Sequence, residues 1–334
     1  MRLLDHIAQS TAPLIVRQHS GAQWRLTGAS DFARQLVQCP LRYVLSDELV
    51  RTCIALAYSD GDELSACLDL LHLPAEQVWI EWDEAARHAE LTRWLPQQCS
   101  RLDVPPASRA GVLICAPPHC RSGTLRTFWL TGSEPREPVL AAVETLLDLD
   151  GTAGTAAPAE LLNGGCVAVS DPGSEQVDSL LRCARFRLDG AWQRYYQQVA
   201  DSAQLRRRVM EHSLAAVAFD VPLLLALFLL MSIRDDLVRL PVDPQRLNSK
   251  RLRLGKPPLL EHLEICAPVF SPAAAGRAES SGALRRAPRF HHVRGHIVRR
   301  FDTVYWRAPH WRGHVRLGSV RSRTVELHVP GLAT

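Results

Sequence analysis

The most apolar stretch of the chain is LLLALFLLM, residues 223–231. It lies inside a longer run, residues 214–233, that is nearly long enough to span a bilayer. Asp220 and Pro222 interrupt this run, and a charge at mid-bilayer is costly. We therefore expect a core helix that is buried all round rather than a membrane span, with Asp220 as its N-cap and Pro222 in its first turn.

The residues that precede this helix continue a helical pattern, which we extend from Ser174 to about Arg239. A first helix there carries Ala184 on its apolar face, and a second covers residues 200–217. Further towards the N-terminus, some segments show the apolar spacing of helices and others the alternation of strands. The patterns predict helices at 47–58 and 62–71, a strand at 78–82, and a hairpin of strands 111–116 and 124–131 around a turn-rich connection.

The C-terminal part begins with a stretch rich in Ala, Ser and Gly, residues 271–282, which is typical of a flexible linker. Short alternating segments follow at 293–300, 303–307 and 324–329 and suit strands. The fold class we predict is α+β. It comprises a mixed region (1–150), a helical region (158–240), a basic arm with the linker (241–284) and a small Arg/His-rich β module (285–334).

The charge of the chain is distributed unevenly. Residues 285–328 contain eleven arginines and only two acids, Asp302 and Glu326, which gives a net charge of +9, whereas the rest of the chain carries −5. Arginine replaces lysine almost everywhere, which a GC-rich genome explains. Codon usage does not explain why residues 285–328 contain so few acidic residues. The asymmetry indicates a polyanionic partner, or an acidic protein surface on which the module docks.

The other compositional signals are those of an ordinary globular protein. Apolar residues make up 46% and charged residues 22% of the 334. Nine cysteines are scattered without a regular framework, so we expect reduced thiols, mostly buried, in a cytosolic compartment. The N-terminal residues lack the apolar core of a secretory signal. We therefore place the protein in the cytoplasm.

Arginines alternate with aromatic residues in the C-terminal module, and this pattern combines phosphate contacts with surfaces for base stacking. The alternative is that the aromatics form the only core of a module this small. A second basic cluster lies at 248–260, and it fits equally a basic extended arm laid over a partner or a solvated connector. The candidate contacts are Arg289, Arg294, Arg299, Arg300, Tyr305, Trp306, Trp311, Arg312, Arg316, Lys250, Arg251 and Lys256.

Four histidines of the module share a spacing of four residues, namely His292 with His296 and His310 with His314. On one strand such a pair lies too far apart to share a metal, but two pairs facing across a hairpin could place one histidine from each beside zinc. Hydrogen-bonded structural histidines are the simpler interpretation. We expect no cofactor and no metal.

Other stretches carry weaker signals. Cys115 and the His119-Cys120 pair lack a second ligand cluster, and the Gly164-Gly165 turn lacks the lysine of a phosphate loop. Glu81 and Asp83 flank Trp82 on a predicted strand, where exposure to solvent is the simplest explanation. Nucleophile elbows, paired CxxC motifs and HExxH motifs are absent from the sequence, so we do not expect an enzyme.

Three separated stretches resemble a group of phage- and prophage-encoded proteins. They are Leu73-Pro74 with VWIEW (78–82), then Leu247-Asn248 with Arg251 and GKPPLLEH (255–262), then PRxH (288–291) with RGHI (294–297), VYW (304–306), His310 and Arg312-Gly313. Phe290 and Val293 depart from the group's pattern. The resemblance implies phage origin and no particular activity.

These observations lead to one expected function with two alternatives. We expect a phage-encoded, non-enzymatic protein whose basic C-terminal module contacts DNA or RNA in the host cytoplasm. The first alternative is a virion structural or assembly component that binds acidic phage proteins and forms homo-oligomers. The second is a metal-dependent nuclease that uses the histidines, although no acidic ligands accompany them. We expect no membrane partner.

Overall fold

The computed structural model describes residues 2–9, 15–17, 23–25, 29–96, 107–118, 121–132, 136–150, 179–198, 203–232, 237–267, 289–293, 296–300, 303–307, 310–312 and 314–319. The chain divides into two compact units, Met1–Pro268 and Val269–Thr334. Together the two units hold both helices and strands, so the predicted α+β class is confirmed.

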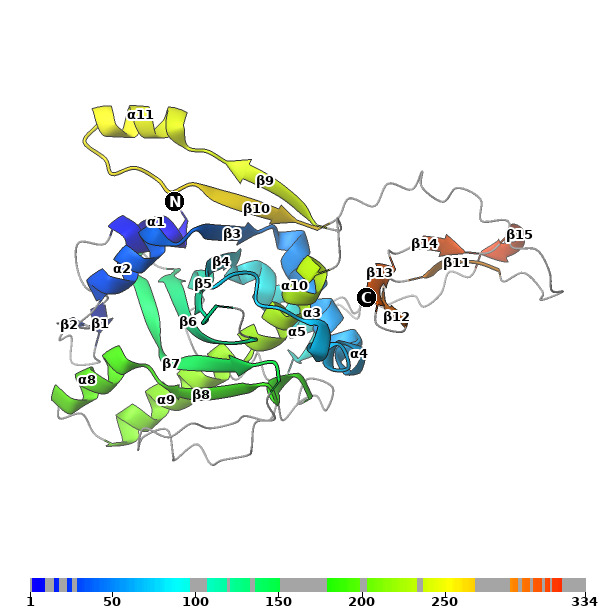
Figure 1. Cartoon of the computed structure of the whole chain (residues 1–334), viewed down its shortest axis with the longest axis horizontal. Helices are drawn as coiled ribbons and strands as arrows, with labels where there is room; N and C mark the ends of the chain where they lie inside the picture. The colour runs from blue at the N-terminus through cyan, green and yellow to red at the C-terminus, as the bar shows by residue number, and fades with distance from the viewer. Residues whose placement is uncertain are drawn as a thin grey trace, which may run out of the picture. The chain divides into compact units, whose positions relative to one another are not determined.

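The first unit is built on an eight-stranded mixed sheet (Figure 1). Strand β3 pairs in parallel with β4 and with β10, and the other neighbours are antiparallel. The order across the sheet is β8 (Ala184–Leu188), β7 (Pro138–Asp148), β6 (Ser122–Thr131), β5 (Ala107–Cys115), β4 (Gln77–Asp83), β3 (Leu41–Leu45), β10 (His262–Cys266) and β9 (Val238–Val242).

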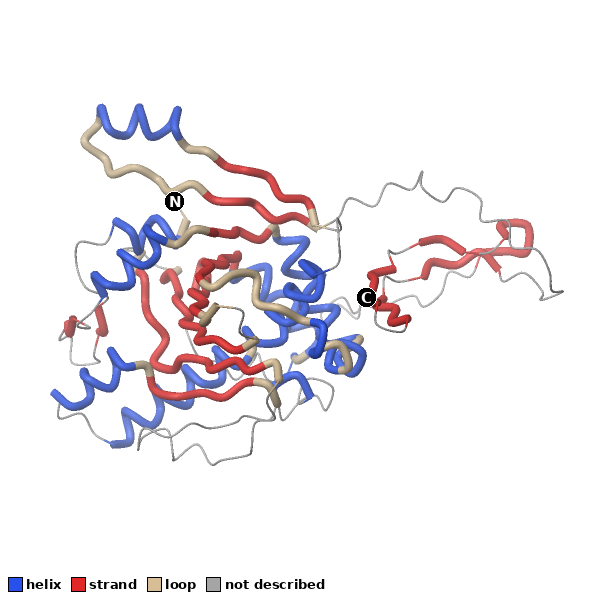
Figure 2. Tube along the Cα trace, in the orientation of Figure 1, coloured by secondary structure: helices blue, strands red, loops and turns tan. Residues whose placement is uncertain are grey.

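Helices pack on both faces of this sheet (Figure 2). One face contacts α3 (Asp47–Ser59) and α5 (Glu84–Trp94), and α10 (Asp220–Ser232) packs there against α3 and meets β6 through Asp220 and Thr127. The other face contacts α1 (Leu3–Gln9), and α2 (Ala29–Gln38) packs against α1 and meets β6 through Phe32 and Phe128. The remaining described elements of the unit are α4 (Gly61–Ser65), the 3-10 turn η1 (Leu68–Leu70), α8 (Gly190–Gln198), α9 (Ala203–Ala218), α11 (Gln245–Arg253) and the small pair β1 (Ile15–Arg17) and β2 (Gln23–Arg25).

The buried apolar helix is confirmed. Every residue of α10 from Asp220 to Leu230 is buried. The described residues contain one helical stretch that is long and apolar enough to cross a membrane, Val209–Ser232, and 78% of its most apolar window is buried inside the protein. It is a core helix, because α3, α9 and α4 pack against α10 and bury its apolar residues.

Several predicted elements are confirmed and others need correction. The helix at 47–58, the strand at 78–82, the hairpin of β5 and β6 and the helix at 200–217 are present. The helical region from 174 to 239 is wrong in part, because Ala184 begins strand β8, which pairs with β7. The helix at 62–71 is broken into α4 and η1. The predicted linker at 271–282, the Gly164-Gly165 turn, the His119-Cys120 pair and the strand at 324–329 lie outside the described residues.

Six of the nine cysteines lie in the described residues, and all six are free thiols. Cys39, Cys53, Cys67 and Cys183 are buried, while Cys115 and Cys266 are partly exposed. The prediction that the cysteines are mostly buried is therefore confirmed for this part of the chain, and their reduced state stays a prediction.

A close contact in the centre of the sheet gives a first test of the packing. Trp79 is fully buried and lies over Gly111 on the neighbouring strand, so a Cβ at Gly111 would come 2.4 Å from a ring carbon of Trp79. We expect Gly111→Ala to lower the free energy of unfolding by about 1–3 kcal/mol, the usual effect of overpacking. Chemical denaturation would measure it.

Gly190→Ala provides the control for this substitution. Gly190 begins α8, and the nearest atom to a Cβ there is 3.7 Å away, which is an ordinary contact. The control should unfold at nearly the wild-type denaturant concentration. Equal effects of the two substitutions would contradict the tight packing of Trp79 on Gly111.

The second unit is described as five short strands. Strand β11 (Arg289–Val293) pairs with β14 (His310–Arg312) in antiparallel and with β15 (His314–Ser319) in parallel. Strands β12 (His296–Arg300) and β13 (Thr303–Arg307) form a separate antiparallel hairpin. The predicted strand at 303–307 is thus present, and the one at 293–300 is present over 296–300, with Val293 ending β11 and residues 294–295 outside the described residues.

Candidate nucleic-acid interface

The fully charged residues in the five described strands of the second unit are all positive. They contain Arg289, Arg299, Arg300, Arg307, Arg312 and Arg316 and no aspartate or glutamate. The exposure of three of these side chains is described, and Arg299, Arg300 and Arg307 are all exposed. All three lie on the β12–β13 hairpin, so this hairpin presents several guanidinium groups to solvent.

The same hairpin has a buried position. Ile297 is 8% exposed, and the register places it directly opposite Trp306, while Val298 lies opposite Tyr305. Residues on one strand alternate between its two faces, so the exposed Arg300 and the buried Ile297 belong to different faces. By the same alternation and register, Arg300 and Arg307 lie on the face opposite Ile297, whereas Arg299 shares the face of Ile297.

The register also bears on the four histidines. His292 lies opposite Trp311, and His310 lies opposite Val293. His296 lies opposite Arg307, and His314 opposite Arg289. No two of these four histidines are direct cross-strand partners in the described strands, so the register does not create the facing pairs that a shared zinc would need. Among the described residues, no group of three His, Cys, Asp or Glu side chains could hold a metal ion.

The other predicted contacts lie in the first unit or outside the described residues. Lys250 and Arg251 are part of α11, and Lys256 follows it. The expectation of an extended arm at 248–260 is therefore wrong for its first half. Arg294 lies outside the described residues. The remaining predicted contacts all belong to strands of the second unit, namely Arg289 in β11, Arg299 and Arg300 in β12, Tyr305 and Trp306 in β13, Trp311 and Arg312 in β14, and Arg316 in β15.

Helix α11 stands at the tip of the hairpin formed by β9 and β10 (Figure 1). It ends in a left-handed turn, because Gly255 has a φ of 65° with nothing near its Cβ position. The amide of Gly255 donates to the carbonyl of Leu252, and that of Lys256 donates to the carbonyl of Arg251. This pair of bonds is the Schellman motif, which stops a helix and turns the chain back.

Side chains then fix the returning chain to the helix. The Asn248 side chain donates to the carbonyl of Leu259 (3.0 Å) and accepts from its amide (2.8 Å). Arg251 donates to the carbonyl of Pro257, and the amide of Leu260 donates to the carboxylate of Asp5 in α1. Several residues of the stretch 247–262 thus have a structural role, and they make the α11 arm (residues 238–261) a defined element.

The outer surface of α11 is cationic. Arg246, Lys250 and Arg253 are exposed and follow the spacing i, i+4, i+7, which places them on one face of the helix. Residues 245–256 contain five basic residues and no acid. Sequence reasoning counted Arg253 in the basic cluster but not among the candidate contacts, and it overlooked Arg246 because it treated this segment as extended. The absence of acids and the helical spacing were the available signals.

Glu81, which we expected to be exposed to solvent, is fully buried. Its carboxylate accepts hydrogen bonds from the amides of Leu3 (2.8 Å) and Leu4 (3.0 Å), from the indole of Trp79 and from the guanidinium of Arg109. The prediction is wrong because the strand lies in the centre of the sheet, with α1 above it. Through these hydrogen bonds Glu81 connects the first residues of α1 to strand β4.

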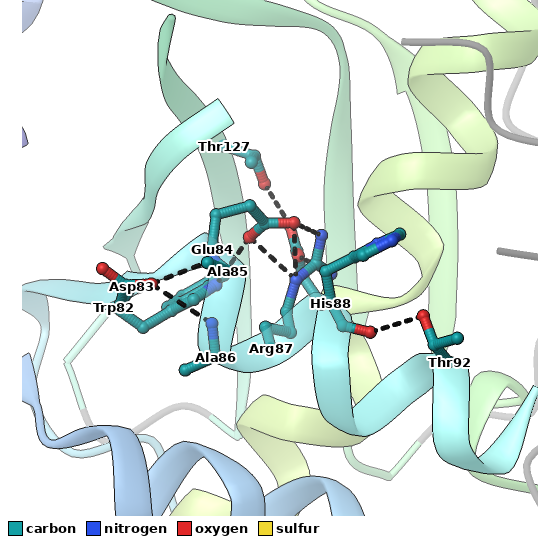
Figure 3. Close-up of polar contacts among 10 residues, drawn as sticks. Trp82, Asp83, Glu84, Ala85, Ala86, Arg87, His88, Thr92 and Thr127 are labelled. Atoms are coloured by element: carbon teal, nitrogen blue, oxygen red, sulfur yellow. Dashed lines mark hydrogen bonds and ion pairs between the residues drawn. The ribbon is translucent and has the colours of Figure 1, made fainter. Parts of the chain in front are cut away.

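A second buried ionic group connects α5, α10 and β6. Arg87 donates to both carboxylates beside it, Glu84 and Asp220, and Thr127 donates to Asp220 at 2.9 Å (Figure 3). Asp220 therefore uses its carboxylate for these contacts and not as the predicted N-cap of α10. Burial raises the pKa of Asp220 to about 7, against the opposing effects of Arg87 and the Thr127 hydrogen bond.

A third charged group lies at the β6–β8 edge of the sheet. Arg126 contacts Asp189 (3.1 Å) and Glu144 (3.0 Å), and Arg187 contacts Glu144 from the neighbouring strand. Both acids are buried, and Arg126 also lies over the ring of Phe32. The acids of this group are held by cations from adjacent strands, an arrangement that accounts for their burial without a chemical step.

A cavity of about 400 Å³ lies near the other end of the same strands. Its lining includes Cys115, Cys183, Ser122, Arg182 and Asp148. Burial raises the pKa of the Cys115 thiol and raises that of Cys183 to about 12. Both thiols are therefore protonated at neutral pH and are poor nucleophiles. Neither thiol in the lining of the cavity is therefore an activated nucleophile.

Comparison with known proteins gives no relative for this chain. No protein-family model matches it, and neither a curated protein nor a solved structure matches it.

Proposed function

We propose that this is a phage-encoded, non-enzymatic protein whose C-terminal module contacts nucleic acid in the host cell. The observation that carries the proposal is the charge of the five described strands, in which six arginines occur without a single acid. Guanidinium groups bind phosphate oxygens in bidentate fashion, and strands without acids do not repel the phosphate backbone.

The β12–β13 hairpin is the part of the module whose side chains support this function best. Arg299, Arg300 and Arg307 are exposed on it, and the buried Ile297 gives the hairpin a packed side. The contacts would run along phosphates and therefore bind DNA or RNA without reading bases. Tyr305, which shares a face of the hairpin with Arg300 and Arg307, and Trp311 are the residues proposed to stack on unpaired bases. Trp306 belongs by register to the face of the buried Ile297, so it is the weakest of the three predicted stacking residues.

Salt dependence tests the proposal directly. About six phosphate contacts imply that the logarithm of the association constant falls with the logarithm of salt concentration with a slope of about −4 to −5. Replacing Arg299 and Arg300 together by alanine should reduce the magnitude of this slope by about one to two. Fluorescence anisotropy with labelled single-stranded and double-stranded DNA and RNA would measure it for the full-length chain.

The control for this experiment is a pair of arginines on the first unit. Arg34 and Arg207 are exposed on α2 and α9, and each pairs only with an acid of its own helix. Replacing both by alanine removes the same charge as the hairpin variant, but the slope should stay at the wild-type value. No binding at low salt by the folded protein would overturn the proposed function.

A second candidate function, a virion or assembly component, is favoured by a different observation. The first unit exposes several large apolar side chains on one element, the α11 arm, and exposed apolar patches mark protein contacts rather than phosphate contacts. In that case the protein would be virion-associated, and its partners would be acidic phage proteins.

A further inference from the structure

The exposed apolar residues of the described chain are concentrated on one element. Of the six large hydrophobic side chains that are exposed, five belong to the α11 arm: Val238, Leu240, Leu247, Leu252 and Leu254. Leu252 and Leu254 are each 62% exposed. They stand beside the exposed cations Lys250 and Arg253, so the arm combines apolar and positive surface.

Strand β9 forms the free edge of the sheet, but it is poorly suited to adding another strand. Pro241 lies in the middle of β9 and has no amide hydrogen to donate. An approaching partner would therefore meet the side chains of the arm rather than its backbone. The Schellman turn and the Asn248–Leu259 pair hold α11 in place, so its docking would need little additional ordering.

A surface of opposite charge lies elsewhere on the same unit. Residues 60–76, which we call the acidic corner, contain five acids and neither lysine nor arginine, whereas residues 245–256 contain five bases and no acid. Asp62, Glu63, Asp69 and Glu76 are exposed. Arg121 lies close by, but it pairs with Asp150 and donates to the carbonyls of Leu68, Asp69 and Leu71.

The two surfaces lie on different parts of the first unit. Figure 1 shows α11 at the outer tip of the β9–β10 hairpin and α4, which carries Asp62 and Glu63, at the far corner. The acidic corner also has apolar contact area, because Leu68 and Leu70 of η1 are half-buried. A single copy would not bring these surfaces together, whereas two copies would.

We propose that copies of this chain associate head to tail, with the α11 arm of one copy docked on the acidic corner of the next. The exposed leucines favour a protein over a nucleic acid as the occupant of the arm. The charges at the ends of α4 and α11 also stabilise those short helices through the helix dipole. That effect explains the charges but does not explain why leucine side chains of the arm are exposed to solvent. A contact between two different surfaces produces rings or open filaments.

The experiment is a charge swap in the full-length chain, purified free of nucleic acid. One variant reverses the arm with Lys250→Glu and Arg253→Glu, and the other reverses the corner with Asp62→Lys and Glu63→Lys. Each variant alone should remain monomeric in sedimentation velocity, because like charges then meet at the substituted positions and the net charge falls from +5 to +1 in residues 245–256, or from −5 to −1 in residues 60–76. An equimolar mixture should associate again, because each reversed surface meets its complement in the other variant.

Two further measurements make the test specific. Wild-type association should weaken by about tenfold or more between low and high salt, as expected of a contact guided by charge. The pair Leu252→Ser and Leu254→Ser should also weaken it, and Arg34→Glu, an exposed charge reversal on α2, should not. Circular dichroism checks that each variant is folded.

The outcomes separate this proposal from the proposed function. A wild-type chain that stays monomeric at all concentrations, or a mixture of the two variants that does not associate, would overturn head-to-tail docking. If the charge-reversed arm variant sediments with the same mass as the wild type but binds DNA more weakly, the arm would be assigned to nucleic acid instead. The anisotropy experiment on Arg299 and Arg300 is unaffected by either result.

Discussion

Replacement of Glu81 by alanine should lower the free energy of unfolding by about 3–5 kcal/mol, the effect expected when one partner of a buried ion pair is removed. The Glu81 side chain is fully buried, and it receives two backbone amides of α1, the Trp79 indole and the Arg109 guanidinium. The substitution leaves Arg109 without its closest acid and leaves the amides of Leu3 and Leu4 without an acceptor. Chemical denaturation followed by tryptophan fluorescence would measure the loss.

The matched control is Glu264→Ala on strand β10. Glu264 also contacts the N-terminal segment, through Arg2 at 3.5 Å, but its side chain is 36% exposed. Exposed ion pairs contribute about 0–1 kcal/mol, so this control should be nearly neutral. Hydrogen exchange at Leu3 and Leu4 should accelerate strongly in Glu81→Ala alone. Equal stability of the two variants would contradict the role of Glu81 as the anchor of α1.

The case of Glu81 explains which parts of the fold the sequence could reveal. Periodicity correctly indicated α3, β4, the β5–β6 hairpin and α10, because each of these elements shows its own alternation or helical spacing. Glu81 sits in the apolar segment of β4, and its charge suggested solvent. Its burial depends on Arg109 from another strand and on α1 from the start of the chain, and local spacing does not report partners so distant.

The errors at β8 and α11 have related causes. Ala184 fits a helical face in isolation, but pairing with β7 draws residues 184–188 into the sheet. Conversely, Pro257 and Pro258 suggested an extended arm at 248–260, whereas the prolines follow the helix that Gly255 ends. The spacing of Arg246, Lys250 and Arg253 was present in the sequence, so this part of the candidate surface could have been predicted.

The candidate interface, too, could be predicted from the sequence in part only. The excess of arginine in the C-terminal module is a property of composition and was visible at once. Which arginines share a face depends on strand register, and register is fixed by pairs such as Ile297 with Trp306 that no single-strand pattern specifies. The acidic corner was overlooked because Asp62 and Glu63 are ordinary residues for the first turn of a helix.

The buried group around Arg87 leads to the second large effect, a dependence of stability on pH. One guanidinium there faces two carboxylates, Glu84 and Asp220, and burial raises the pKa of Asp220 from 3.8 to about 7. The folded protein therefore holds this proton more tightly than the unfolded chain does. The resulting stabilisation is fully present at low pH and is lost as the pH rises from about 4 towards 7.

Asp220→Asn isolates this contribution. Asparagine has a similar volume and stays neutral at every pH, so the variant should lack the part of the pH dependence that comes from this one group. The wild-type free energy of unfolding should fall relative to the variant by up to about 1.4 kcal/mol per pH unit over this range. Urea denaturation at closely spaced pH values would measure the difference in free energy of unfolding between wild type and variant. Groups that titrate in the same way in both proteins do not contribute to this difference.

The control is Asp31→Asn, at an exposed carboxylate on α2, which should follow the wild-type curve. A constant difference between wild type and Asp220→Asn across the range would show that Asp220 is already charged in the folded protein. In that case Arg87 would outweigh burial, and the group would be an ordinary buried ion pair that requires both of its partners at every pH.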